Sequence, residues 1–347
     1  MKSFLMAAAV LFSTQAFAAI WLSPDLKLEI RSNARPLDVP IAMSCQDKIA
    51  QAICIVDPPK KDNAGKPREC LPGAELYAQA FKDVYERFPL FLQKTMCGLN
   101  KIYVEKEFMA TAYAAPEMSD KGVFMGASIG IRKAFVDQAL TYMGWASWKE
   151  QLNFGGDPKA YHVDPGLPVV NTSLSTYSDF LFVVLSHEMG HVLDFANGLN
   201  AYTDCNFDPA TGKVAGTCLP AAGSWSEISW ANMDVPVPSQ DFALRGSACF
   251  YSCEGNAMAP NQAFDFYSQL FNSGFISVYA STNPYDDFAD SVAYFTADRF
   301  LGSRYAIQLA DGRSFDAIAH LNSPLLARKV KFIDRFLIGN FNYPGRP

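Results

Sequence analysis

The sequence predicts an α+β fold in which a mixed β-sheet is followed by a long buried helix and then by a helical subdomain. Segments whose apolar and polar residues alternate as in strands gather between residues 101 and 132. Residues 179–198 then read as one helix that is apolar on nearly all sides, which is typical of a buried helix. The chain also holds eight cysteines, an even number, so we expect disulfides to brace the fold.

The first 18 residues are typical of a cleavable signal peptide. Lys2 precedes a short apolar run, and Ala16 and Ala18 supply the small residues that a signal peptidase requires. The apolar run is too short to span a membrane, and no later segment is apolar enough over the required length. We therefore expect a soluble protein, secreted or periplasmic, from a bacterial source.

After the signal peptide at residues 1–18 we expect two parts. They are an N-terminal cysteine-containing extension at 19–72 and a catalytic domain at 73–347, with an insertion containing cysteine and tryptophan at about 199–262. The net charge of −6 and the lack of a dense Lys/Arg cluster argue against nucleic acid and anionic membranes as partners. The sequence leaves the oligomeric state open.

All eight cysteines follow the signal peptide, so in an exported protein we expect them to be oxidised. Cys205 with Cys218, and Cys249 with Cys253, each bracket a loop rich in Gly, Pro or Ser, which favours pairing between these neighbours. The alternative for Cys249 and Cys253 is a metal-binding pair, but no second pair of suitable spacing accompanies it.

Alternation and turn residues predict the other elements in order along the chain. Residues 55–73 are rich in Pro, Gly, Lys and Asp, which indicates a loop. Gly126 and Gly130 predict a bulge or a close backbone approach within the last of the predicted strands. The predicted strands cover residues 26–31, 101–106, 108–114 and 123–132. The predicted helices cover residues 74–88, 90–96, 135–143, 145–148, 262–271 and 325–337.

The segment His187-Glu188-Met189-Gly190-His191 carries the strongest functional signal. Two histidines four residues apart on a helix lie one above the other, with about 5–6 Å between their Cβ atoms. From this spacing two imidazoles can bind one Zn²⁺, while the glutamate between them lies beside the open side of the metal. The alternative is a surface helix with incidental histidines, which the apolar surroundings of the motif disfavour.

The ends of this helix are recognisable in the sequence. Ser178 is a suitable N-cap with Asp179 in the first turn, and Gly198 is suited to end the helix in a left-handed conformation. Asp194 lies on the same face as His187 and His191. Its carboxylate either belongs simply to the end of the helix or accepts an imidazole N–H, and the sequence leaves both readings open.

A catalytic zinc site usually has three protein ligands. The other histidines, His162 and His320, are isolated, and Asn197 stands six residues past the motif, where a metzincin would have its third histidine. Neither isolated histidine is a strong candidate, because a lone residue is a weak signal. We therefore expect the third ligand to be a carboxylate.

The best candidates lie on a second predicted helix, which spans residues 283–302. Asn283 is suited to cap it, and Pro284 is suited to its first position. Asp286 and Asp290 are four residues apart and share a face, so Asp286 can bind zinc while Asp290 accepts the N–H of a ligand histidine. The alternative is that these acids only offset the helix dipole.

The two segments together resemble the gluzincin metallopeptidases, in which a His-Glu-x-x-His helix is followed by a helix bearing two acids four residues apart. The segment from Tyr279 to Asp290 also resembles the corresponding part of the anthrax lethal factor metallopeptidase family. These resemblances imply a zincin-like fold, Asp286 as third ligand and Tyr279 as a hydrogen-bond donor to the transition state. Aspartate replaces the glutamate of those families at the ligand position, so the second helix must lie closer, or Asp287 must bind instead.

The sequence thus predicts a secreted zinc metallopeptidase that acts on a peptide or protein substrate. Glu188 is expected to be the general base, with Tyr279 stabilising the oxyanion. The strand at 128–132 is expected to align the substrate backbone. The alternatives are a non-catalytic zincin-like binding module and a zinc hydrolase of cell-wall amide bonds.

Overall fold

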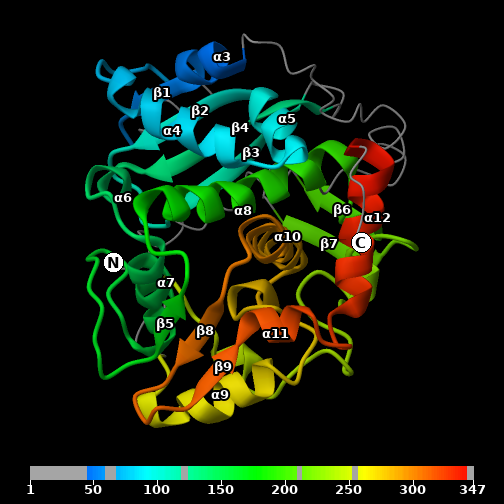
Figure 1. Cartoon of the computed structure of the whole chain (residues 1–347). Helices are drawn as coiled ribbons and strands as arrows, with labels where there is room; N and C mark the ends of the chain where they lie inside the picture. Colours follow the sequence, from blue (N-terminus) through cyan, green and yellow to red (C-terminus); the bar gives the residue numbers. More distant parts are fainter. Residues whose placement is uncertain (1–44, 59–67, 119–123, 209–212, 252–256, 342–347) are drawn as a thin grey trace, which may run out of the picture.

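The computed structural model describes residues 45–58, 68–118, 124–208, 213–251 and 257–341 (Figure 1). The predicted signal peptide and the predicted strand at 26–31 therefore lie outside the described residues. Within them the chain has an α+β fold with a mixed sheet, as predicted.

The larger sheet has four strands in the order β1-β2-β4-β3. Strands β1 (Ile53–Val56), β2 (Leu99–Glu105) and β4 (Phe124–Arg132) are parallel, whereas β3 (Ala112–Met118) runs antiparallel to β4 and forms one edge. The predicted strands at 101–106 and 123–132 are confirmed. The strand predicted at 108–114 begins only at residue 112, and residues 55 and 56 of the predicted loop belong to β1.

The expectation that the strand at 128–132 aligns a substrate is wrong. These residues lie in β4, which is paired with β2 on one side and with β3 on the other. Its backbone N–H and C=O groups are therefore already used in the sheet. Only an edge strand has unpaired backbone groups, and here the edge next to α8 (Tyr177–Asn197) is β3.

Gly130 confirms the predicted close approach within β4. A Cβ atom at this position would lie 2.1 Å from Cε1 of Tyr113 on the neighbouring strand β3. The tyrosine ring therefore lies directly on the glycine, and its hydroxyl donates to Glu105.

Helices pack around the larger sheet (Figure 1). They are α3 (Cys45–Ala52), α4 (Glu75–Arg87), α5 (Leu90–Cys97) and α8, and the predicted helices at 74–88 and 90–96 are confirmed. Helix α8 packs against β3 and β4 as well as α4 and α5. Strand β1 belongs to this sheet and α3 packs in the same hydrophobic core, so residues 45–56 of the predicted N-terminal extension are continuous with the part that follows residue 72.

Residues 138–141 interrupt the helix predicted at 135–143, which is divided into α6 (Lys133–Asp137) and the start of α7 (Tyr142–Gln151), and the helix predicted at 145–148 lies within α7. Helices α9 (Ala263–Leu270) and α12 (Ala327–Phe341) lie close to their predicted ranges. A second sheet, which the sequence did not predict, contains β5 (Val169–Thr172), β8 (Tyr305–Gln308) and β9 (Ser314–Asp316). The remaining helices are α10 (Pro284–Leu301) and α11 (Ala317–Leu321). In Figure 1 the segments α7, β5, β8, β9, α9 and α11 lie below α8.

The predicted insertion contains a hairpin of β6 (Tyr202–Asp208) and β7 (Lys213–Pro220), and the disulfide Cys205–Cys218 joins its strands as predicted. Two further disulfides, Cys45–Cys97 and Cys54–Cys70, brace the N-terminal side of the larger sheet. Cys249 is also in a disulfide, whereas Cys253 lies outside the described residues. None of the described cysteines is a free thiol.

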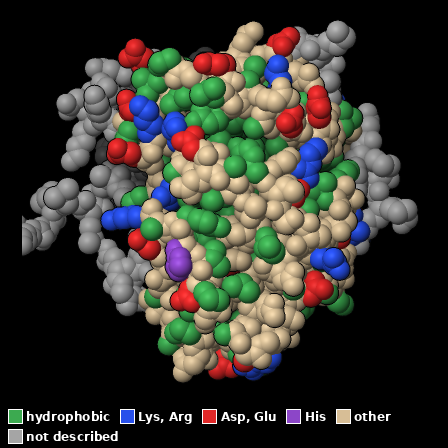
Figure 2. All heavy atoms as spheres, turned by 60° about the vertical axis from the view of Figure 1, so that its left-hand side comes forward, with side chains coloured by type: hydrophobic (Ala, Val, Ile, Leu, Met, Phe, Trp, Pro, Cys, Tyr) green, Lys and Arg blue, Asp and Glu red, His purple; other side chains and the backbone are tan. Residues whose placement is uncertain are grey.

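In the described part of the chain, no helix is both long enough and apolar enough to cross a lipid bilayer. On the face seen in Figure 2, basic and acidic side chains are interspersed with small groups of hydrophobic ones.

Candidate metal centre

Helix α8 carries the motif, and its ends fix where the motif lies. Its N-cap is Thr176 and not Ser178 as predicted, because the Thr176 hydroxyl accepts from the backbone N–H of Asp179, whose carboxylate in turn accepts from the backbone N–H of Thr176. Ser178 instead lies in the first turn and accepts a hydrogen bond from Arg87. Gly198 ends the helix with φ of 58°, as predicted.

Helix α10 crosses α8 at Gly190, the fourth residue of the motif. A Cβ atom on Gly190 would lie 2.8 Å from the Cα atom of Ala289. Two small residues therefore let the two backbones approach closely. This close approach compensates for the short side chain of an aspartate at the expected ligand position.

The two helices bring His187, His191 and Asp286 together. Oδ1 of Asp286 lies 3.6 Å from Nε2 of His187 and 3.3 Å from Nε2 of His191, and the two Nε2 atoms are 3.2 Å apart. The three side chains are only 12–13% exposed. Among the described residues this is the one group of three whose ligand atoms all lie within 4.8 Å of one another.

Asp286 is held in place by the start of its own helix. Asn283 caps α10 by accepting from the backbone N–H groups of Tyr285 and Asp286. The side-chain amide of Asn283 also donates to Oδ2 of Asp286 at 2.5 Å, which leaves Oδ1 directed at the imidazoles. The predicted cap thus also orients the candidate ligand.

Asp290, one turn further along α10, contacts the other side of His187. Nδ1 of His187 lies 2.6 Å from Oδ1 of Asp290, an arrangement in which the imidazole N–H donates to the carboxylate. Ser277 donates to the second oxygen of Asp290. This pair fixes the His187 ring so that Nε2 faces Asp286.

The electrostatics of the cluster favour positive charge. Burial alone would lower the pKa of His187, but the charge of Asp290 and hydrogen bonds to Asp286 and Asp290 raise it to about 10. Burial alone would raise the pKa of Asp286, yet its hydrogen bonds to both histidines hold that pKa well below its usual range. Such a cluster could hold a cation, either protons or a metal ion.

Glu188 is buried beside the cluster, and its carboxylate is not fully partnered. Oε2 of Glu188 is shielded from solvent and has no hydrogen-bond partner among the described residues. Burial raises the pKa of Glu188, against the opposing effect of the nearby imidazoles of His187 and His191. An unpartnered buried carboxylate is costly, so a group that donates a hydrogen bond to this oxygen would stabilise it.

Other predicted candidates lie elsewhere. The carboxylate of Asp194 accepts from the backbone and side-chain N–H groups of Asn200, whose amide also donates to the carbonyl of Pro284. It makes no hydrogen bond to an imidazole of a described residue, so its prediction as an imidazole partner is wrong. Through Asn200, Asp194 instead connects the end of α8 to the start of α10.

Asp287 is excluded as an alternative ligand by its environment. Its carboxylate is 0% exposed and forms an ion pair with the buried Lys329, at 2.6 and 2.7 Å from Nζ. Trp230 donates to the same carboxylate at 3.0 Å. Neither isolated histidine joins the cluster, since His162 is exposed and His320 lies against the carbonyl of Phe275.

Tyr279 lies beside the cluster, with its ring centroid 5.8 Å from that of His187. Sequence reasoning missed two of its neighbours, Lys149 on α7 and Tyr251 in the loop after β7, which line the same pocket. Lys149 directly follows Trp148 in the sequence, and no sequence pattern there distinguishes this lysine from one on the surface.

Comparison of the chain with models of known protein families, with curated proteins and with solved structures found no match. The chemistry of the site therefore rests on the side chains described above.

Proposed function

We propose that this protein is a zinc-dependent metallopeptidase with a zincin-like fold, exported from the cell through its predicted signal peptide. The observation that carries the proposal is the combination of Glu188, which has an unpartnered buried oxygen, with the cluster of His187, His191 and Asp286. Disulfides in the described part of the chain are compatible with a secreted or periplasmic location.

The donor set fits zinc. Two imidazole nitrogens and one carboxylate oxygen are a usual set of protein ligands for catalytic Zn²⁺. His187, His191 and Asp286 would hold the ion, and the hydrogen bond from His187 to Asp290 supplies the supporting carboxylate that such histidines usually have. When bound, zinc lowers the pKa of water and polarises a carbonyl group.

The residues of the chain have separate tasks in peptide hydrolysis. Glu188 takes the proton from the attacking water and later passes it to the leaving amine. Burial raises the pKa of the Tyr279 phenol well above its usual value, so this group keeps its proton and can donate a hydrogen bond to the oxyanion. The edge strand β3, which begins beside the pocket at Ala112, is the element suited to align an extended substrate.

The decisive variant is Glu188→Gln, which keeps the size of the side chain but removes its basicity. We expect the variant to fold and bind zinc, while peptide turnover falls by about 10²–10⁴-fold, the usual contribution of a positioned general base. Turnover is measured by mass spectrometry on a broad peptide library, and zinc by elemental analysis. Glu69→Gln, at an exposed position, is the matched control and should retain full turnover.

If the zinc-loaded wild-type protein leaves the peptide library intact, the proposed peptidase activity is contradicted. Cleavage of cell-wall amides instead would assign the same residues to another zinc hydrolase. Inactivity on both substrates would favour a binding module.

A further inference from the structure

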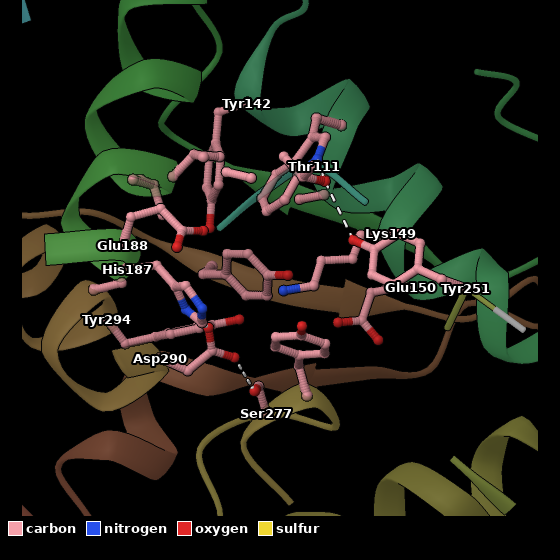
Figure 3. A pocket seen from close by; sticks show the side chains of 18 residues that line it. Thr111, Tyr142, Lys149, Glu150, His187, Glu188, Tyr251, Ser277, Asp290 and Tyr294 are labelled. Atoms are coloured by element: carbon pink, nitrogen blue, oxygen red, sulfur yellow. Dashed lines mark hydrogen bonds and ion pairs between the residues drawn. The ribbon is translucent and has the colours of Figure 1, made fainter. Parts of the chain in front are cut away.

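A cavity of about 50 Å³ lies directly beside His187 and Glu188. Residues of α7, α8, α10 and β8 line most of it, and Figure 3 shows Lys149 extending into it from α7 towards the side chains of α8 and α10. His187 and Glu188 line it whereas His191 and Asp286 do not, so the cavity extends the candidate site on the side of His187.

Three phenol hydroxyls and the ammonium of Lys149 supply hydrogen-bond donors in this cavity. Tyr142, Tyr294 and Tyr305 line it, and burial raises the pKa of each phenol well above its usual value, so all three keep their protons. Of the carboxylates there, Asp290 and Glu150 already accept hydrogen bonds, whereas Oε2 of Glu188 has no partner among the described residues. Both oxygens of Asp290 already accept hydrogen bonds, and one oxygen of Glu150 accepts from Tyr267 at 2.7 Å.

Lys149 lines this cavity, and among the described residues no carboxylate is a direct partner of its ammonium. Its Nζ lies 3.9 Å from the centre of the Tyr279 ring, and no described residue accepts a hydrogen bond from it. Burial lowers its pKa, but the negative charges of Asp290, Asp286 and Glu150 more than offset this, so the ammonium stays charged. A buried ammonium without an acceptor is unfavourable, and an incoming carboxylate would supply one.

We propose that this cavity is a selectivity subsite that receives a carboxylate of the substrate close to the scissile bond, and that Lys149 binds that carboxylate. The cavity has room for a short acidic group. Two sources share this chemistry, the side chain of an aspartate and the free C-terminus of a short peptide. This inference rests on the proposed peptidase function.

Binding separates the two sources without requiring turnover. Zinc-loaded Glu188→Gln protein is titrated with four fluorescent seven-residue peptides, which carry Asp or Asn at the centre and a free or amidated C-terminus. We expect the favoured carboxylate to tighten binding by about tenfold to hundredfold, as hydrogen bonds to charged groups usually do. A preference for Asp identifies the side chain, and a preference for the free terminus identifies an exopeptidase-like subsite.

Lys149→Met, which keeps the length of the side chain but not its charge, should abolish this preference. Lys331→Met, at an exposed position on α12, is the matched control and should preserve it. Equal affinities for all four peptides, or a preference that survives Lys149→Met, would overturn the subsite.

Turnover of the same peptides by the wild-type protein tests the peptidase separately. Preferential binding without turnover would leave the subsite standing and reject the peptidase. Turnover of all four peptides without any preference would support the peptidase and reject the subsite.

Discussion

At the scale of single residues, neighbouring acids on α10 have opposite surroundings. Asp286 faces two imidazoles, whereas Asp287 is directed into the core, where Lys329 and Trp230 bind its carboxylate. Successive residues on a helix are rotated by roughly 100° about its axis, so only one of the two can face α8. The division of roles between them follows from this rotation.

The first prediction contrasts Asp286→Asn with Asp287→Asn. Asp286→Asn should lose most bound zinc while remaining folded, because its carboxylate belongs to the metal cluster. Asp287→Asn should retain zinc but lose about 3–5 kcal/mol of the free energy of unfolding, since it leaves the buried Lys329 without its counter-charge. Elemental analysis and urea denaturation distinguish the two, and zinc loss of equal size in both variants would contradict the assignment.

A second prediction concerns Glu150, whose carboxyl group is buried next to the cavity. Burial raises its pKa from 4.5 to about 7, with Asp290 acting in the same direction and the hydrogen bond from Tyr267 and the charge of Lys149 opposing. Between pH 4.5 and 7 the folded protein therefore binds more protons at this group than the unfolded chain does. Its contribution to stability must fall as pH rises through this window.

Glu150→Gln should remove this dependence. The variant should match wild type near pH 4.5 and gain in relative stability up to pH 8, by as much as about 3 kcal/mol at roughly 1.4 kcal/mol per pKa unit. Urea denaturation at several pH values measures the difference. A constant difference across the whole range would mean that Glu150 titrates at its usual pKa.

At the scale of elements, the contact between α8 and α10 builds the site. Glycine inside a helix lowers helix stability by about 1 kcal/mol relative to alanine, so its presence at position 190 requires a reason. The reason is the backbone of Ala289, which leaves no room for a Cβ atom. The two helix ends are also tied together, because Asp194 and Asn200 connect the end of α8 to Pro284.

The third prediction is that Gly190→Ala weakens zinc binding by at least tenfold. The added Cβ atom forces α10 away from α8 and withdraws Asp286 from the histidines. Overpacking of this kind usually lowers stability by about 1–3 kcal/mol, in spite of the better helix propensity of alanine. Competition with a zinc-binding dye measures the affinity.

Gly339→Ala is the matched control for this change. Gly339 lies on α12, and a Cβ atom there would contact nothing within 4 Å. This variant should therefore bind zinc normally and gain up to about 1 kcal/mol of stability from helix propensity. If Gly190→Ala behaved in the same way, the close approach of the helices would not control the site.

At the scale of the whole molecule, one hydrophobic core extends from Cys45 to Phe341. Trp225 and Trp230 of the predicted insertion are fully buried in this core, so the insertion is part of the main fold. The disulfides differ in what they connect. Cys45–Cys97 joins residues 52 positions apart, whereas Cys205–Cys218 closes a hairpin over 13 positions.

The fourth prediction compares the loss of these two disulfides. Chain-entropy arguments give about 4 kcal/mol of stability for the longer loop and about 3 kcal/mol for the shorter one. The double variant Cys45→Ser/Cys97→Ser should therefore be the less stable of the two in urea. Cys205→Ser/Cys218→Ser should keep full zinc occupancy, because its hairpin contributes no ligand, and zinc loss there would show that the hairpin supports the site.

The sequence by itself determined the features that depend on local spacing. Helix periodicity placed His187 and His191 on one face, the cap residues gave the ends of α10, and alternation located β2 and β4. The sequence misplaced the N-cap of α8 by only two residues, at Ser178 where the structure has Thr176. Both residue types are good N-caps, and only their contacts in the fold decide which of them caps the helix.

Only the tertiary structure decided the features that depend on how distant elements meet. It separated Asp286 from Asp287 and Asp194, made β3 the edge strand in place of β4, and directed Lys149 into a cavity beside His187 and Glu188. The physical reason is that an aspartate, a strand or a lysine has the same local propensity wherever it packs. Its role is fixed by the packing of residues far away in the chain, which no local pattern encodes.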